Sequence, residues 1–333
     1  MNDNFPLRAQ QGTFQLFRDQ SLLVTAPDGE VRGDGIEGAY YANTRLLSRL
    51  ALRVNGRPLT LVQAAPARDD LLVAYYHDPS VTQDDDYQDR ALLVQLTVAT
   101  GAGFHLDLDA RNHSLAPIAC DLDLLLAADF ADLEEQRQGK RLQRGEVRRR
   151  CLLEESGEVR FDYLHPGLSE GAVLRFTPSP RCHDDGVRWR LDLPPQADWH
   201  GCVAIAPVHQ GVEVTPAARC YGTDSDTAGE PPTWQERATR IDTSNDGVRR
   251  AYTRAVHDLA ALALEQGSPV EQPAFAAGIP FYQNPFGRDL LTTSWQALLA
   301  TPVLLESAIL TCERTQGTTT DDFRDEQPGR IIQ

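Results

Sequence analysis

The chain has 333 residues and a formal net charge of −16, because 48 acidic residues outnumber 32 basic ones. With 41% hydrophobic residues it is too apolar for a disordered protein, and its acidic balance argues against nucleic-acid binding, which needs a basic face. At roughly 100–200 residues per domain, the length predicts two domains, or one large β unit followed by a smaller piece.

The first ten residues contain no basic segment followed by an apolar one, so the sequence predicts no signal peptide. No apolar run approaches the roughly 18–20 residues that span a bilayer. The six cysteines form no CxxC pair, and in a chain of this length they indicate reduced structural thiols. We therefore expect a cytoplasmic protein with no membrane partner. The sequence leaves the oligomeric state open.

Residues 13 to about 220 carry the signals of an all-β region. Segments such as Ser21–Thr25 and Leu50–Val54 are short and apolar or alternating, and turn sequences such as Pro27-Asp28-Gly29 separate them. The stretch His105-Leu106-Asp107-Leu108-Asp109 alternates polar and apolar residues, as a half-buried strand does. Strands at this spacing predict a large antiparallel β-sandwich and not a parallel α/β sheet.

The composition changes after residue 221. Residues 222–243 are rich in Gly, Pro, Ser and Asp, which predicts a linker between a β-sandwich domain at 1–221 and a helical domain at 244–333. Apolar residues from Tyr252 to Ala263 recur with helical spacing, and helical stretches at about 289–300 and 302–315 follow. Three helices over roughly 70 residues make a poor independent fold on buried-area grounds. We therefore expect the helical domain to be truncated.

A loop between two predicted helices offers the sharpest candidate site. It ends in the adjacent Arg288 and Asp289, a guanidinium donor beside a carboxylate acceptor. Such a pair can bind the vicinal hydroxyls of a sugar, while Phe281, Tyr282 and Phe286 could cover its apolar ring faces. The alternative, which spacing alone favours, is that Asp289 caps the helix and Arg288 pairs on the surface.

A second polar loop follows the last predicted helix. Residues 321–330 carry four carboxylates, among them Asp325 and Glu326, together with two arginines. Loops at one end of helices are common places for sites, so Asp325 and Glu326 are further candidate substrate-binding residues. From the residues alone, a solvated charged turn is the better explanation.

Other polar groupings have simpler structural explanations. The run Asp84-Asp85-Asp86 lacks the alternate spacing of a calcium loop, and the basic stretch from Arg137 to Arg150 predicts a solvated hairpin. The eight histidines are dispersed, without an HxxxH pair or a Cys/His cluster, so the sequence predicts no metal site. Without a P-loop, GxGxxG or GxSxG motif, we expect no cofactor.

Several motifs together resemble one protein family. Taken in the order in which they occur along the chain, these motifs make it similar to the bacterial glycogen debranching enzyme-like proteins of the amylo-alpha-1,6-glucosidase group. The similar segments cover most of the chain and are Ser21–Gly29, Asn43–Gly56, Asp129–Asp132, His257–Leu262, Ala277–Pro280, Phe286–Asp289 and Arg324–Gly329.

The resemblance implies a β-sandwich (a supersandwich) followed by the (α/α)6 barrel of six-hairpin glycosidases. It also implies an α-glucan or oligosaccharide as substrate, with Arg288 and Asp289 holding the non-reducing-end sugar. Hydrolysis in such barrels is inverting, with an acid and a base carboxyl about 6.5–9.5 Å apart.

The chain departs from the family pattern in ways that matter for activity. Phe281 stands where the family usually has Trp, and Leu133–Arg137 replaces a Phe-Glu-Val-Arg-Gly run. The chain ends at Gln333, before the barrel segment that would carry the general acid and base. The catalytic residues are thus unknown, and an inactive fragment is expected. The alternative is a noncatalytic carbohydrate-binding or accessory β-sandwich protein.

Overall fold

The computed structural model describes residues 12–79, 91–142, 144–216, 219–222, 238–264, 274–322 and 325–332. Most of the predicted linker at 222–243 and the acidic run at 84–86 lie outside the described residues. The chain forms two compact units, Met1–Leu16 with Ser21–Thr223, and Phe17–Gln20 with Asp224–Gln333. We call them the β unit and the helical unit.

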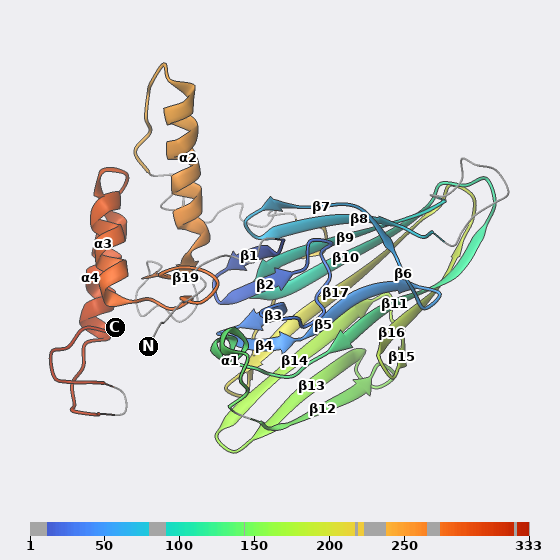
Figure 1. Ribbon diagram of the computed structural model, residues 1–333, viewed down its shortest axis with the longest axis horizontal. Coiled ribbons are helices and arrows are strands. Elements are labelled where there is room, and N and C mark those ends of the chain that lie inside the picture. The colour runs from blue at the N-terminus through green and yellow to red at the C-terminus, as the bar shows by residue number, and fades with distance from the viewer. Residues whose placement is uncertain are drawn as a thin grey trace. The chain divides into compact units, whose positions relative to one another are not determined.

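A nine-stranded sheet is the largest element of the β unit (Figure 1). Its order is β12-β13-β14-β17-β10-β9-β8-β7, and β18 pairs with β17. The strands are β7 (Thr60–Arg68), β8 (Leu71–His77), β9 (Leu92–Gly101), β10 (Gly103–Asn112), β12 (Glu146–Leu152), β13 (Glu158–His165), β14 (Leu168–Thr177), β17 (Asp198–His209) and β18 (Val212–Glu213).

Two smaller sheets and two short helical segments complete the β unit. A five-stranded sheet has the order β15-β16-β11-β5-β6, and a four-stranded sheet has the order β1-β2-β3-β4. Their strands are β1 (Phe14–Arg18), β2 (Ser21–Thr25), β3 (Gly38–Tyr41), β4 (Thr44–Leu47), β5 (Arg49–Val54), β6 (Arg57–Pro58), β11 (Ile118–Ala127), β15 (Arg181–His183) and β16 (Gly186–Leu193). The helical segments are α1 (Leu133–Gln138) and η1 (Cys220–Gly222).

One hydrophobic cluster joins the nine-stranded and five-stranded sheets. It includes Leu96 of β9, Leu106 and Leu108 of β10, and Leu122 and Leu124 of β11, each of them fully buried. Burying a leucine side chain contributes about 1.5–3 kcal/mol, so this shared cluster holds the sheets face to face. Between the described strands of both sheets the pairing is antiparallel. The predicted antiparallel β fold is therefore confirmed.

In the described part of the helical unit there are three α-helices, at the places that the apolar spacing predicts. Its elements are α2 (Asp246–Ala261), β19 (Ala263–Leu264), β20 (Ala274–Phe275), α3 (Gly287–Gln296), η2 (Ala297–Leu299) and α4 (Val303–Arg314). Asn245 caps α2 by accepting hydrogen bonds from the backbone N–H groups of Gly247 and Val248. Leu290, Leu304 and residues near them form a small core. Whether these helices begin an (α/α)6 barrel stays a prediction.

A disulfide corrects the prediction that all six cysteines are reduced. Cys151 of β12 is bonded to Cys182 of β15, and the other four cysteines are free. β12 and β15 are the edge strands of two different sheets, and their cysteines are 31 residues apart in the chain. The sequence gives no sign that these edges meet, so the spacing of the cysteines could not predict the bond.

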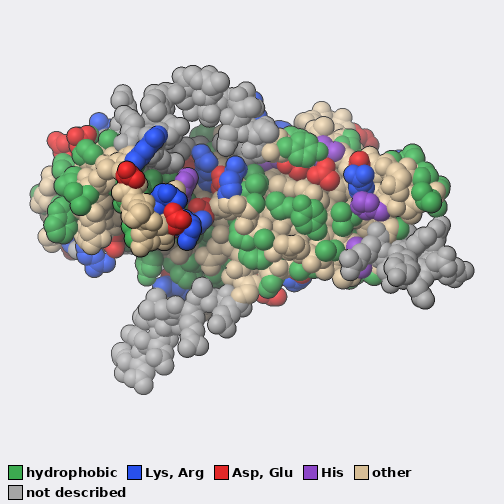
Figure 2. Space-filling view, turned by 90° about the horizontal axis from the view of Figure 1, so that it is seen from above, with side chains coloured by type: hydrophobic (Ala, Val, Ile, Leu, Met, Phe, Trp, Pro, Cys, Tyr) green, Lys and Arg blue, Asp and Glu red, His purple; other side chains and the backbone are tan. Residues whose placement is uncertain are grey.

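Acidic and basic side chains are interspersed on the face that Figure 2 presents. Among the described residues of the β unit, ion pairs include Arg53 with Glu30 at 2.8 Å and Arg150 with Asp162 at 2.7 Å. The arginines in these pairs therefore lie beside carboxylates, which offset their positive charge. Among the helices that the structure describes, none is both long and apolar enough to cross a membrane.

Candidate functional site

Two of the motif segments meet in the β unit. The backbone N–H of Arg45, in β4, donates to the carbonyl of Ala131 at 2.8 Å, and its Nε donates to Oδ1 of Asp129 at 3.0 Å. The guanidinium also donates to the carbonyl oxygen of Glu37 at 2.9 Å. The Arg45 side chain is only 5% exposed, so this ion pair fixes the loop before α1 against β4.

A capping box starts α1 directly after this loop. The carboxylate of Asp132 accepts from the N–H of Glu134 at 2.8 Å, and Glu135 accepts from the N–H of Asp132 at 3.1 Å. Burial raises the pKa of Asp132, and hydrogen bonds from the backbone offset this only in part. The helix thus places three carboxyl groups within one short segment.

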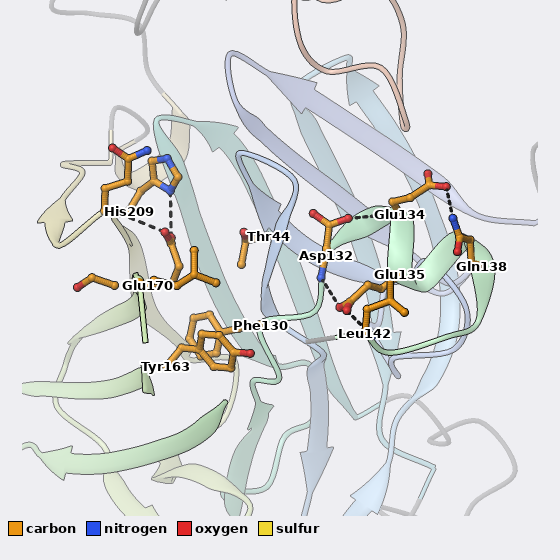
Figure 3. A pocket seen from close by; sticks show the side chains of 14 residues that line it. Thr44, Phe130, Asp132, Glu134, Glu135, Gln138, Leu142, Tyr163, Glu170 and His209 are labelled. Carbon is orange, nitrogen blue, oxygen red and sulfur yellow. Dashed lines mark hydrogen bonds and ion pairs between the residues drawn. The ribbon is translucent and has the colours of Figure 1, made fainter. Parts of the chain in front are cut away.

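A pocket of about 780 Å³ lies beside α1 (Figure 3). Phe130 and Tyr163 form a stacked pair in its lining, with ring centroids 5.4 Å apart. Also in the lining, Glu170 accepts from Nδ1 of His209 at 3.0 Å and from the N–H of Gln210 at 3.2 Å. The lining residues are Thr44, Phe130, Asp132, Glu134, Glu135, Gln138, Leu142, Tyr163, Gly167, Leu168, Ser169, Glu170, His209 and Gln210.

The pocket has the size and chemistry of a small-molecule site. Its volume lies within the roughly 300–1,000 Å³ usual for ligand pockets. Carboxylates accept hydrogen bonds from hydroxyl groups, amides can donate or accept, and aromatic rings cover apolar faces. We did not predict this site from the sequence, although Asp132 and Glu135 have the spacing of a capping box, a detectable signal for α1.

In the helical unit, the predicted pair Arg288–Asp289 lies in the first turn of α3. Nη2 of Arg288 is 3.4 Å from Oδ2 of Asp289, and the two side chains are 88% and 39% exposed. The N-cap position belongs to Phe286, so Asp289 is not the capping residue that the alternative interpretation required. An ion pair this exposed adds little stability, which leaves both groups available to a ligand.

The aromatic residues of the same loop lie near this pair in the chain. Tyr282 and Phe286 contact edge to face with ring centroids 5.8 Å apart, and Tyr282 is half exposed. Reciprocal backbone hydrogen bonds between Gly278 and Tyr282, at 2.9 and 2.8 Å, form the tight turn that presents the tyrosine. Phe281 is partly buried.

The second predicted loop is held by its own carboxylates. Asp325 forms a bidentate ion pair with Arg330 at 2.6 Å, and Glu326 accepts from the N–H groups of Thr318 and Thr319 at 2.9 and 3.2 Å. The loop also reaches α3, because the N–H of Gly287 donates to the carbonyl of Ile332 at 3.0 Å. The structure therefore brings the two predicted loops to one end of α3.

The fold also assembles a group that the dispersed histidines and cysteines did not suggest. One donor atom from each of His105, Asp107, Cys202 and Cys220 lies within 4.8 Å of the others. His105 is far from Cys202 and Cys220 along the chain, but the fold brings these two cysteines and the histidine together, so the expectation of no Cys/His cluster is wrong for the folded protein.

These features define an antiparallel β-sandwich protein with a polar, aromatic-lined pocket. Residues 16–204 match the family described as the N-terminal domain of some glycogen debranching enzymes. The match spans more than half of the chain, so the protein belongs to this family. Comparison with curated proteins finds no match.

Two solved structures that the chain matches are distant from it in sequence. A galactose mutarotase-like protein from Clostridium acetobutylicum is 8% identical, with a TM-score of 0.37 over 59% of this chain and 95% of that one. A galactose mutarotase-like protein from Lactobacillus casei is also 8% identical, with a TM-score of 0.34 over 59% of this chain and 100% of that one.

Proposed function

We propose that the protein serves α-glucan breakdown as part of a glycogen-debranching glycoside hydrolase lineage of the amylo-alpha-1,6-glucosidase group. The observation that carries this proposal is the family match over residues 16–204. We further propose the division 1–221, 222–243 and 244–333 as β-sandwich, linker and the first helices of an (α/α)6 barrel. The order of the motifs and the helical spacing after residue 244 support that division.

In this proposal Arg288 and Asp289 bind a terminal sugar and do not transfer protons. An arginine guanidinium can only donate hydrogen bonds, and it stays charged at all physiological pH values. Asp289 is the matching acceptor, and Tyr282 and Phe286, whose rings contact each other in the preceding loop, would offer ring faces to the sugar. The sugar would thus be oriented by its hydroxyl groups while the aromatic rings exclude water from one side.

We also propose that this 333-residue chain binds sugar without hydrolysing it. Inverting hydrolysis needs two carboxyl groups about 6.5–9.5 Å apart on opposite sides of the bond. Asp325 and Glu326 are adjacent in sequence, and both already hold their own loop, through Arg330 and through Thr318 and Thr319. Neither carboxylate is therefore poised as a general acid.

A second candidate function rests on the pocket beside α1. Its stacked Phe130–Tyr163 pair and surrounding carboxylates fit a noncatalytic carbohydrate-binding role for the β unit itself. In that case the β unit would hold a glucan segment independently of Arg288 and Asp289.

Affinity electrophoresis in glycogen gels, with calorimetry on maltooligosaccharides, separates the two candidates. We expect Arg288→Ala and Asp289→Asn to weaken binding if the helical loop is the site, and Glu170→Gln and Gln138→Ala if the pocket is. Glu146→Gln, an exposed change elsewhere in the β unit, is the matched control. Unchanged binding in all four variants, or no binding by the parent chain, would contradict both.

The hydrolysis proposal has its own test. Glucose release from maltooligosaccharides and branched dextrins is measured for the purified chain and for Glu326→Gln. We expect none from either. Clear release by the parent that disappears in the variant would place the catalytic carboxylate in this loop and overturn the proposal.

A further inference from the structure

Two neighbouring strands in the middle of the nine-stranded sheet carry an unusual run of metal-binding side chains. On β10, His105, Asp107 and Asp109 alternate with apolar residues and so share one face of the sheet. On β17, Cys202 lies directly opposite Asp107, and His200 lies directly opposite Asp109. The register therefore gathers residues about 95 positions apart into one polar patch.

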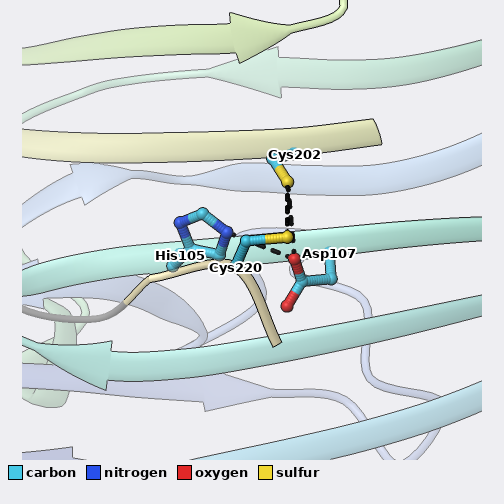
Figure 4. A group of neighbouring side chains, drawn as sticks. All are labelled: His105, Asp107, Cys202 and Cys220. Atoms are coloured by element: carbon cyan, nitrogen blue, oxygen red, sulfur yellow. Dashed lines mark hydrogen bonds and ion pairs between the residues drawn. The ribbon is translucent and has the colours of Figure 1, made fainter. Parts of the chain in front are cut away.

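A later segment of the chain closes this patch from outside the sheet. Cys220 begins η1, and its Sγ lies 3.2 Å from Sγ of Cys202. The N–H of Tyr221, the next residue, donates to Oδ2 of Asp107 at 2.9 Å. Figure 4 shows His105, Asp107, Cys202 and Cys220 converging on one point. Asp107 and His105 are buried there, at 1% and 7% exposure, while Cys202 and Cys220 are partly exposed.

The donor-atom distances, 2.9–3.9 Å, are close to those of a tetrahedral site, and the distances from His200 to the cysteine sulfurs and between the two sulfurs are the ones that must lengthen on metal binding. Sγ of Cys202 is 3.5 Å from Oδ1 of Asp107, and Nε2 of His200 is 2.9 Å from Sγ of Cys202 and 3.1 Å from Sγ of Cys220. The same Nε2 is 3.9 Å from Oδ1 of Asp107. With zinc bonds of about 2.0–2.3 Å, tetrahedral geometry places neighbouring ligand atoms roughly 3.3–3.8 Å apart.

The second nitrogen of His200 is also held as metal-binding histidines usually are. Its Nδ1 lies 2.8 Å from Oδ1 of Asp109 and 2.9 Å from the hydroxyl of Tyr221, whose ring stacks on the imidazole. A carboxylate on Nδ1 fixes the tautomer that leaves Nε2 free to accept a metal. On the other side of the patch, Nε2 of His105 lies 3.2 Å from Oδ1 of Asp107 and orients that carboxylate.

We propose that Asp107, His200, Cys202 and Cys220 bind one Zn²⁺ ion, with Asp109 and His105 orienting two of the ligands. Two cysteine sulfurs with one imidazole and one carboxylate form a donor set that suits zinc and not the hard cations calcium and magnesium. Four protein ligands leave no open position, which makes the site structural. The ion ties η1 to the centre of the sheet.

Zinc content and a cobalt spectrum test the site on the full chain. After purification with a phosphine reductant and without chelator, we expect about one zinc per chain, as four-ligand structural sites hold. Replacing zinc with Co²⁺ is expected to give a thiolate-to-cobalt charge-transfer band and tetrahedral visible bands. Zinc is also expected to protect Cys202 and Cys220 of the unaltered chain from alkylation, as mapped by mass spectrometry.

Variants identify the ligands. We expect Cys202→Ser, Cys220→Ser and His200→Ala to abolish the cobalt charge-transfer band or the bound zinc, and Asp109→Asn to weaken zinc binding about 10–100-fold. Cys312→Ala and His113→Asn, which change a cysteine and a histidine outside the group, are expected to retain the ion.

Three results would overturn the proposal. One is an unaltered chain that binds neither zinc nor cobalt under reducing conditions. Another is a Cys202–Cys220 disulfide in the native protein, with zinc failing to protect either thiol after reduction. The third is full retention of zinc in His200→Ala with loss in His105→Ala, which would refute His200 as the fourth ligand.

Discussion

The β unit and the helical unit bury their side chains to very different extents. In the β unit, one cluster of buried leucines, valines and aromatic residues runs through the nine-stranded, the five-stranded and the four-stranded sheet. Among the described residues of the helical unit, the core cluster has six buried members, and no residue of α2 is buried. Trp295 and Leu299 are 66% and 90% exposed. The sequence after residue 244 thus forms helices, but their described residues bury a much smaller hydrophobic core than the strands of the β unit do.

Hydrogen exchange should show the largest effect of this difference. We expect the amides of β9, β10 and β17 to exchange only through global opening, at a cost of about 5–15 kcal/mol. Amides of α2 should exchange at close to the rates of a fraying helix, because little apolar burial opposes local opening. Measurement is by native-state exchange with mass spectrometry. Equal protection of α2 and β10 would remove the distinction between the units.

The next largest effect is expected from removing the ion pair between Arg45 and Asp129, which should destabilise the β unit and leave the helical unit unchanged. Replacing Arg45 with Met removes the ion pair with Asp129, which is 35% exposed and keeps Arg141 at 3.9 Å. It also leaves the buried Glu37 carbonyl without this donor, so we expect the β unit to lose about 1–3 kcal/mol. Urea unfolding followed by tryptophan fluorescence measures the change, and helical-unit exchange should stay as it was. Arg57→Met, an exposed arginine of β6, is the control. A loss under 1 kcal/mol would mean that the pair is dispensable.

The smallest expected effect is a pH dependence confined to the β unit. Burial raises the pKa of Asp162, but hydrogen bonds from Arg160 and Arg150 outweigh it and hold the pKa below its usual value. These two ion pairs therefore stabilise the fold above about pH 4, and their contribution is lost as the pH falls through the folded-state pKa of Asp162. Because the Arg150 and Arg160 side chains are 46% and 31% exposed, solvent screens both ion pairs, and we expect under about 1 kcal/mol.

Asp162→Asn, with Asp192→Asn as an exposed control, checks this by urea titration between pH 7 and pH 3. The difference between parent and Asp162→Asn should shrink toward the acid end. A difference that instead grows on acidification would have the wrong sign for a carboxylate with a lowered pKa.

The sequence predicted the periodic parts of the molecule well. Alternation predicted the strands, and spacing after residue 244 predicted α2, α3 and α4 within a few residues of their observed bounds. It also predicted Arg288 and Asp289 at the start of a helix, where they lie. These features depend on neighbours in the chain, which is the information that periodicity contains.

Features that depend on register could not be predicted in the same way. The alternation at residues 105–109 suggests one face open to water, yet Asp107 is 1% exposed because η1 covers that face. The contact of Asp107 with Cys202 needs the pairing of β10 with β17, and the bond between Cys151 and Cys182 needs two sheet edges to meet. Neither the pairing of β10 with β17 nor the meeting of the two sheet edges can be deduced from a single sequence.

The disulfide has a mechanical consequence for the β-sandwich. β12 and β15 are each the terminal strand of their sheet, and at the opposite ends of the two sheets lie β7 and β6. At the other margin, β6 and β7 are joined by the single residue Leu59, so both margins of the sandwich are covalently tied, one by the disulfide and one by the backbone. Reduction of the disulfide would leave, of these two ties, only the Leu59 connection, and the two sheets could then separate first at the β12–β15 margin.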